Sequence, residues 1–207
     1  MTIRVLLADD ENLIREALAQ MLGLQDDIEV VAQAASGDEA LAVALKVEPD
    51  VAVLDLQMPG RGPRPLDGIE VAEELAARMP ACSSVIVTSH GRPGHLKRAL
   101  AVGVRGFLPK TTSATTLGEV IRKVHDGGRH VDPELAAEAI SAGDSPLTPR
   151  EADVLELAAD GAPIEEIARR ASLSPGTVRN YLSSASTKLG AANRHDACAT
   201  ARRLGWI

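Results

Sequence analysis

The stretch "IRVLLADDE", residues 3–11, places three carboxylates directly after a short apolar run. Val, Leu and Ile in a near-continuous run of this length are typical of a strand buried on both faces of a parallel sheet. Adjacent carboxylates repel one another, and the end of an apolar strand raises the energetic cost of crowding them. The acidic run is therefore either a solvated turn that begins a helix or one wall of a site for a cation.

The composition indicates a globular protein. The chain has 207 residues, of which 45% are hydrophobic and 25% charged, so it is long enough for two modest domains with packed cores. It shows neither an apolar run long enough to span a membrane nor a basic region followed by a long apolar core. Cys82 and Cys198 lack metal-type spacing and are interpreted as reduced thiols. We therefore expect a cytoplasmic protein without a membrane partner.

The charge is unevenly distributed along the chain. The net charge of −7 argues against a protein that coats nucleic acid by bulk attraction. From Pro146 onward, eight Lys and Arg residues stand against seven Asp and Glu residues, so the acidic excess lies in the preceding part. An acidic N-terminal part and a nearly neutral C-terminal part are compatible with two domains of different function.

The first half of the chain alternates between strand patterns and helix patterns. After the first apolar run, four more follow: Ile28–Ala34, Val51–Leu54, Val85–Val87 and Arg105–Leu108. Apolar residues at helical spacing lie between and after these runs, at Ile14–Leu22, Ala40–Leu45, Leu96–Leu100 and Leu117–Val124. Five such units with right-handed crossovers predict an α/β fold, a doubly wound five-stranded parallel sheet. A dinucleotide site is not expected, because no G-x-G-x-x-G motif follows the first strand.

Polar side chains follow four of the five predicted strands. Asp9 and Asp10 come after the first strand, Asp55 after the third, Thr88 after the fourth and Lys110 after the fifth. In such a sheet, ligands bind at the carboxyl ends of the strands, so these side chains are expected to meet there. Three carboxylates form an oxygen cage suited to Mg²⁺, and the lysine and hydroxyl would hold an oxyanion beside it. This combination predicts phosphoryl transfer to an aspartate.

The motifs "LLADDE", "VAVLDLQMPG", "VIVTS" and "GVRGFLPK" resemble the receiver domain of two-component response regulators, over about residues 2–127. The resemblance implies that Asp55 is the phospho-acceptor. It also implies that Asp10, Asp55 and the backbone carbonyl of Gln57 ligate Mg²⁺ directly, while Asp9 acts through water. A sensor histidine kinase is the partner that such a domain implies.

The same resemblance assigns roles to three further residues. Lys110 would pair with the phosphoryl group, and Thr88 would hydrogen-bond to it after phosphorylation. Phe107 matches the switch aromatic of the family, whose ring turns inward as the threonine moves. A plain core phenylalanine in a strand is the alternative, and both interpretations of Phe107 stay open.

One departure from the family pattern lies beside the expected phosphorylation site. Six residues, Arg61 to Leu66, separate Gly60 from Asp67, where the family usually has about one. Their Gly, Pro and Arg content predicts an irregular exposed loop, which either shapes the access of a kinase or is a tolerated insertion. A second Gly/Pro-rich loop carries His90 and His95, interpreted as surface residues because a third metal ligand is missing.

The pattern loosens after about residue 127. Residues 128–145 are interpreted as a linker with a short helix from Asp132-Pro133 to Ile140. We therefore place a receiver at residues 1–127 and an all-helical domain at 146–207. Its first helix begins with the capping box Thr148-Pro149-Arg150-Glu151, and its third begins at Ser174-Pro175. A tight turn before a longer helix, followed by a fourth capped by Asn193, predicts a helix-turn-helix arrangement.

The predicted outer face of the third helix favours contact with nucleic acid. This face carries hydrogen-bonding groups and one positive charge but no acidic side chain: Thr177, Arg179, Asn180, Ser183, Ser184 and Thr187. In a major groove, Arg179 suits guanine and Asn180 suits adenine, while Lys188 is placed to contact a phosphate. A merely solvated face is the alternative.

The region from about residue 145 to 207 resembles the LuxR-type DNA-binding domain, and a receiver followed by this domain is typical of NarL/FixJ-class response regulators. "GRPG" (91–94) and "GTVRNYLS" (176–183) are most similar to the DesR-like subgroup, regulators of membrane-lipid desaturation. The resemblance implies a transcription regulator rather than an enzyme. Phosphorylation would promote a homodimer that binds double-stranded promoter DNA, and RNA polymerase is a further partner to consider.

Two alternative functions stay open at this point. A Mg²⁺-dependent phosphohydrolase would use Asp55 or Asp9 to turn over a substrate, but the C-terminal helices argue against it. A DNA-binding protein that acts without phosphorylation would keep its front domain as an interaction module only. The intact set of carboxylates, Thr88 and Lys110 argues against that second alternative.

Overall fold

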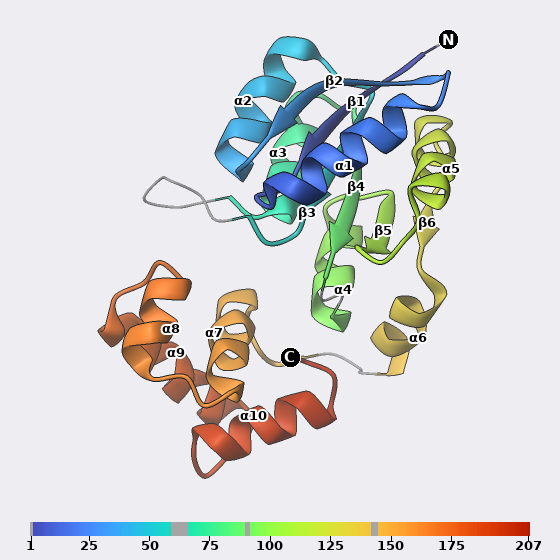
Figure 1. Ribbon diagram of the computed structural model, residues 1–207. Coiled ribbons are helices and arrows are strands. Elements are labelled where there is room, and N and C mark those ends of the chain that lie inside the picture. Colours follow the sequence, from blue (N-terminus) through green and yellow to red (C-terminus); the bar gives the residue numbers. More distant parts are fainter. Residues whose placement is uncertain (1, 59–65, 90–91, 142–144) are drawn as a thin grey trace. The chain divides into compact units, whose positions relative to one another are not determined.

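The computed structural model describes residues 2–58, 66–89, 92–141 and 145–207 (Figure 1). The chain forms two compact units, one comprising 1–91 and 97–133 and the other 92–96 and 134–207. The predicted insertion (all but Leu66), the loop residue His90 and residues 142–144 of the predicted linker lie outside the described part.

The first unit is built on a parallel sheet of six strands in the order β2-β1-β3-β4-β5-β6. The strands are β1 (Ile3–Ala8), β2 (Ile28–Ala34), β3 (Val51–Asp55), β4 (Ser83–Thr88), β5 (Gly106–Pro109) and β6 (His130–Val131). Five of them are the predicted runs, and the doubly wound α/β class is confirmed. The prediction of five strands is wrong by one, because the two residues of β6 lie in what the sequence suggested was linker.

Helices cover both faces of this sheet. They are α1 (Asn12–Gly23), α2 (Gly37–Val47), α3 (Gly68–Arg78) and α5 (Ala114–His125), while α4 (Pro93–Ala101) begins in the second unit and ends in the first. Leu22 of α1 and Ile121 of α5 pack with Val5 and Leu108 in one core cluster, so α1 and α5 cover the same face. Helices α2 and α3 lie side by side, and α3 contacts β3 and β4 (Figure 1). Since neighbouring residues of a strand point to opposite faces, Phe107 lies on the face away from Leu108.

The start of α3 is fixed directly against the third strand. Asp67 caps this helix and forms a reciprocal capping box with Glu70. The next residue, Gly68, donates its backbone N–H to the carbonyl oxygen of Leu56. A Cβ atom at position 68 would stand 2.2 Å from the carbonyl oxygen of Asp55, so only glycine permits this approach. The beginning of α3 is therefore held beside residue 55.

The second unit consists of helices around a core of its own. They are α6 (Pro133–Ser141), α7 (Pro149–Ala159), α8 (Ile164–Arg170), α9 (Pro175–Lys188) and α10 (Arg194–Arg203). The side chains of Thr148, Ser174 and Asn193 cap α7, α9 and α10, as the sequence predicts. Leu155 and Val178 are fully buried in the core that α7, α9 and their neighbours share. Within the described residues, no helix is long and apolar enough to cross a membrane.

Candidate functional site: an acidic cluster and a helix-turn-helix

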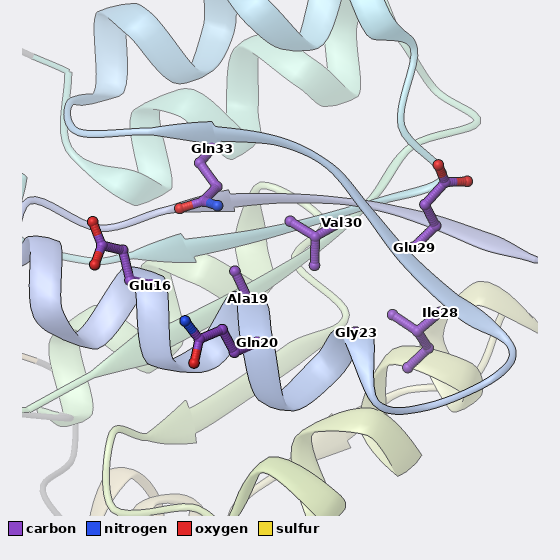
Figure 2. Close-up of a pocket in the computed structure, with 8 residues that line it drawn as sticks. All are labelled: Glu16, Ala19, Gln20, Gly23, Ile28, Glu29, Val30 and Gln33. Atoms are coloured by element: carbon purple, nitrogen blue, oxygen red, sulfur yellow. The ribbon is translucent and has the colours of Figure 1, made fainter.

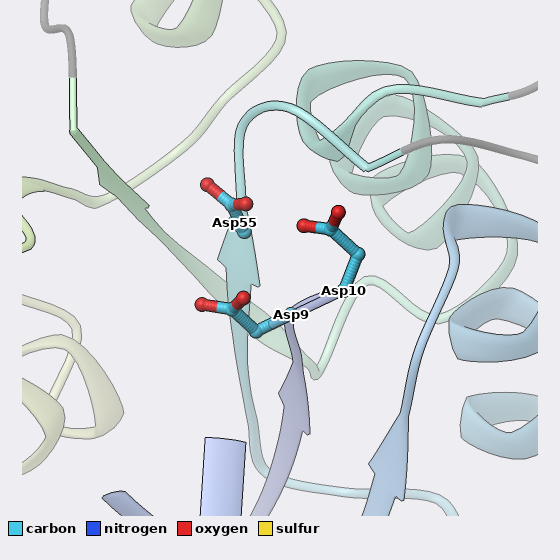
Figure 3. Close-up of side chains that lie close together, drawn as sticks. All are labelled: Asp9, Asp10 and Asp55. Atoms are coloured by element: carbon cyan, nitrogen blue, oxygen red, sulfur yellow. The ribbon is translucent and has the colours of Figure 1, made fainter. Parts of the chain in front are cut away.

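The ends of β1 and β3 bring three carboxylates together (Figure 3). Asp9 and Asp10 directly follow β1, and Asp55 is the last residue of β3. Each offers a carboxylate oxygen within 4.8 Å of those of the other two. Asp9 and Asp55 are 5% and 6% exposed, whereas Asp10 faces solvent. The structure thus places all three predicted aspartates in one cluster.

Lys110 inserts its ammonium group among the carboxylates. Its Nζ lies 2.9 Å from Asp9, 3.0 Å from Glu11 and 3.1 Å from Asp55. The backbone N–H of Lys110 donates to the carbonyl oxygen of Thr88 at 2.8 Å, which ties the end of β5 to the end of β4. Glu11 is a partner that sequence reasoning did not assign. Its place at the end of the opening acidic run was the available signal.

The surroundings of the cluster raise the pKa of two of its carboxyl groups. Burial raises the pKa of Asp55 to about 6, although the attraction of Lys110 opposes this shift. Burial also raises the pKa of the Asp10 carboxyl. Burial disfavours the charge of Lys110, but its hydrogen bonds to Asp9 and Glu11 and the charge of Asp55 outweigh that effect and raise its pKa. A single ammonium therefore only partly offsets the crowded carboxylates.

The cluster suits a divalent cation on the chemistry of its donors. Hard oxygen ligands are those that Mg²⁺ prefers, and one or two protein carboxylates are its usual share. The raised pKa of Asp55 shows that Lys110 does not fully stabilise the buried negative charge. A cation beside Asp9, Asp10 and Asp55 would supply the missing compensation, so the residues present fit a Mg²⁺ ion.

Three further predicted residues lie around this cluster. Thr88 ends β4 and is 2% exposed. Gln57 is exposed, and its backbone N–H donates to the Asp55 carboxylate. Phe107 is fully buried in β5 and pairs with Ile86 of β4 in the sheet register. Full burial agrees with a core phenylalanine and with the inward position of a switch aromatic, so the two interpretations remain open.

Helix α9 presents a polar surface opposite its core side. Val178 and Leu182 are buried against the other helices, whereas Arg179, Asn180 and Ser183 are exposed. Thr177 is half-buried at the start of the helix, where its N–H donates to the hydroxyl of the cap Ser174. The face predicted to read DNA is thus mostly open to solvent.

The buried carboxylate of Glu151 forms hydrogen bonds with Lys188 and Ser184. Glu151 accepts hydrogen bonds from Lys188 Nζ at 2.7 Å and from the Ser184 hydroxyl at 2.6 Å. Burial opposes its charge, but these bonds and that from the Thr148 backbone lower the pKa of Glu151 to about 2. Sequence reasoning treated Glu151 only as part of a capping box and expected Ser184 to face outward. The observed contacts join residues more than thirty positions apart, which no local pattern reveals.

A separate hollow lies between α1 and β2 (Figure 2). Its walls mix acidic, amide and small apolar side chains: Glu16, Ala19, Gln20, Gly23, Ile28, Glu29, Val30 and Gln33. None of the predicted site residues lines it. This hollow is therefore separate from the acidic cluster.

The two units match two known domains. Residues 5–122 match the response regulator receiver domain, and residues 145–201 match the bacterial regulatory proteins of the luxR family. The chain therefore belongs to the two-component response regulators of the NarL/FixJ class, in which a receiver precedes a LuxR-type DNA-binding domain. "Transcriptional regulatory protein DesR" of Bacillus subtilis (strain 168) is 40% identical over 205 residues, covering 99% of each chain. UhpA of Escherichia coli (strain K12) is 35% identical, covering 99% of this chain and all of UhpA.

Solved structures of related regulators have the same architecture. ChrA, a response regulator of a heme-sensing two-component system, is 31% identical with a TM-score of 0.57, covering 100% of this chain and 99% of that chain. The response regulator RcsB in a complex with DNA is 26% identical with a TM-score of 0.62, covering 98% of both chains. These likenesses confirm the predicted receiver fold and the helical LuxR-type domain.

Proposed function

We propose that Asp55 accepts a phosphoryl group from a partner histidine kinase or a small phosphodonor, and that this promotes dimerisation and binding to promoter DNA. The observation that carries this proposal is the environment of Asp55. Its buried carboxylate lies 3.1 Å from the ammonium of Lys110 and within a cluster of acidic side chains. Regulation of transcription in the cytoplasm is the biological role that follows.

The chemical step needs little more than positioning and charge. An oxygen of the Asp55 carboxylate forms a bond to phosphorus while the bond from phosphorus to the donor breaks, so Asp55 must be ionised. Lys110 neutralises the transferred oxygens, and the Thr88 hydroxyl hydrogen-bonds to them. Asp10, Asp55 and the Gln57 carbonyl would hold Mg²⁺ directly, and Asp9 through water. When bound, this ion supplies further charge neutralisation on the phosphoryl group.

Phosphorylation then changes the first unit. The added charge of about −2 attracts Lys110 and Thr88 more strongly than a bare carboxylate does. Because Lys110 directly follows β5, this attraction acts on the strand that carries Phe107. The surface around β5 and α4 changes with it and favours a homodimer.

The second unit would contact DNA through α9. The exposed Arg179, Asn180 and Ser183, with Thr177 at the start of the helix, would enter the major groove. An ammonium group has three N–H donors, so Lys188 can contact a phosphate while it keeps its bond to Glu151. One helix with so few cations binds weakly, and a dimer that presents two such helices to paired half-sites gains strongly. RNA polymerase is a further partner that we propose for the DNA-bound dimer.

Genome-wide DNA binding with and without a functional acceptor tests this function. We expect wild-type protein to dimerise with beryllofluoride and to occupy specific promoters, and the Asp55→Ala variant to do neither. Asp26→Ala, which removes an exposed carboxylate of the same unit, serves as the matched control and should behave as wild type. Equal promoter occupancy by wild type and Asp55→Ala would refute the phosphorylation switch and favour a phosphorylation-independent regulator.

A further inference from the structure

Strand β6 attaches the chain to the receiver sheet just before that chain continues into α6 (Figure 1). It pairs in parallel with β5, with His130 opposite Gly106 and Val131 opposite Phe107. Two backbone N–H groups hold it: that of His130 donates to Arg105 at 2.8 Å, and that of Asp132 to Phe107 at 3.1 Å. Alternate residues of a parallel strand face the same neighbour, so the Val131 N–H points away from β5.

Strand β5 is also the strand that ends at the phosphorylation site. Lys110 directly follows it and contacts the carboxylates of Asp9 and Asp55. On its other side β5 pairs with β4, which ends at Thr88. Thus a single strand lies between the groups that would bind a phosphoryl group and the segment that leads to the DNA-binding domain.

We propose that β6 is the element through which β5 reports phosphorylation to the linker: phosphorylation of Asp55 strengthens the pairing of β6 with β5. This inference rests on the proposed role of Asp55 as the acceptor. By this route, the effect of phosphorylation reaches the linker through backbone hydrogen bonds. It requires neither a partner subunit nor a movement of the helices.

Phosphorylation is expected to strengthen the β5–β6 pairing rather than weaken it, because β6 is weakly held and the end of β5 becomes better fixed. With only two residues, β6 belongs to the least stable part of the sheet. A phosphoryl group of charge about −2 binds the Lys110 ammonium more tightly than one carboxylate does, which fixes the end of β5. A better-ordered β5 offers its carbonyl groups to β6 at a lower entropic cost. The pairing is therefore marginal without phosphate and firmer with it.

Amide hydrogen exchange measured by NMR on the full-length protein tests the proposal. Beryllofluoride with Mg²⁺ is the probe, and its fluorine signal reports whether it is bound at Asp55. With the probe bound, we expect exchange at His130 and Asp132 to slow about tenfold or more, while Val131 serves as the unpaired internal reference. Unchanged exchange at His130 and Asp132 with the probe bound would overturn the coupling alone. Absence of a bound fluorine signal would contradict the proposed acceptor and the coupling with it.

A matched pair of variants tests the same coupling in the reverse direction. His130→Pro removes the N–H that donates to Arg105, whereas His130→Ala removes the same side chain and keeps that N–H. Because coupling between two sites is reciprocal, His130→Pro should weaken the apparent affinity for beryllofluoride about fivefold or more, and His130→Ala should leave it near the wild-type value. Equal affinities for the two variants would overturn the proposal.

Discussion

The carboxyl group of Asp55 combines two opposing requirements. Burial raises its pKa to about 6, whereas attack on phosphorus requires the ionised form. Lys110 at 3.1 Å supplies part of the compensation, but Asp9 lies in the same cluster and opposes ionisation. A cation bound beside these carboxylates would resolve this conflict, and its effect on the pKa of Asp55 is measurable.

Addition of Mg²⁺ should lower the pKa of Asp55 well below 6. A proton and a cation compete for the same carboxylate oxygens, so the bound ion favours the charged form. Carbon-13 NMR titration of the Asp55 carboxyl with EDTA and with excess Mg²⁺ measures the two midpoints. Midpoints that coincide would mean that this carboxylate does not face the ion.

The same shift predicts how stability depends on pH when the metal is removed. The pKa of Asp55 is higher in the folded than in the unfolded protein, so the folded state binds the extra proton. Its stabilising contribution is therefore present below about pH 4 and is lost as pH rises through 6. With EDTA present, Asp55→Asn should remove this loss, which thermal unfolding of both proteins between pH 4 and 7 measures. If the stability of the variant falls by the same amount over this pH range, the loss arises from other titrating groups.

At the scale of elements, Glu151 joins the start of α7 to the end of α9. Because its pKa is lowered from 4.5 to about 2, it stabilises the fold above pH 4.5, and that contribution is lost as pH falls toward 2. Glu151→Gln should destabilise the second unit by about 2 kcal/mol at pH 7, since it removes charged hydrogen bonds to Lys188 and Ser184.

Urea denaturation followed through Trp206, the one tryptophan of the chain, measures this effect on the second unit. Glu165→Gln, at an exposed position of α8, is the matched control and should cost no more than a few tenths of a kcal/mol. A Glu151→Gln variant as stable as this control at pH 7 would show that the Lys188 pair contributes nothing.

Helix α9 carries the prediction on DNA recognition. Arg179→Ala should weaken binding to a promoter identified by genome-wide occupancy by about 5- to 150-fold, the value of one good contact to a base. Arg203→Ala removes an equal charge from an exposed position on α10 and should have a much smaller effect. Fluorescence anisotropy with labelled duplex at fixed salt gives both affinities. Equal losses for the two variants would place Arg179 outside the interface.

How far the elements follow from the sequence depends on the range of the contacts that make them. The convergence of Asp9, Asp10 and Asp55 was predictable, because the carboxyl ends of parallel strands meet at one edge. The caps Ser174 and Asn193 were also predictable, since each bonds within its own first turn. By contrast, β6 has only two residues and is a strand only because it pairs with β5. No local periodicity predicts such a pairing. The bonds of Glu151 to α9 are hidden for the same reason.

At the scale of the whole molecule, two domains share one chain and one signal. The acidic cluster lies in the first unit and the exposed face of α9 in the second, so a signal has to pass from one unit to the other. The proposed β5–β6 pairing is a route along the chain, and phosphorylation-dependent dimerisation is a route through an oligomer. The comparison of His130→Pro with His130→Ala separates the two, since only the first route depends on that backbone hydrogen bond.

The central claim is that Asp55 is the residue that accepts phosphorus. Incubation with acetyl phosphate and Mg²⁺, followed by borohydride reduction and peptide mass spectrometry, locates an acyl phosphate because it converts the modified aspartate to homoserine. We expect homoserine at position 55, and none there in the Asp55→Asn variant. Homoserine at another aspartate, or no modification in protein shown to be folded, would contradict it.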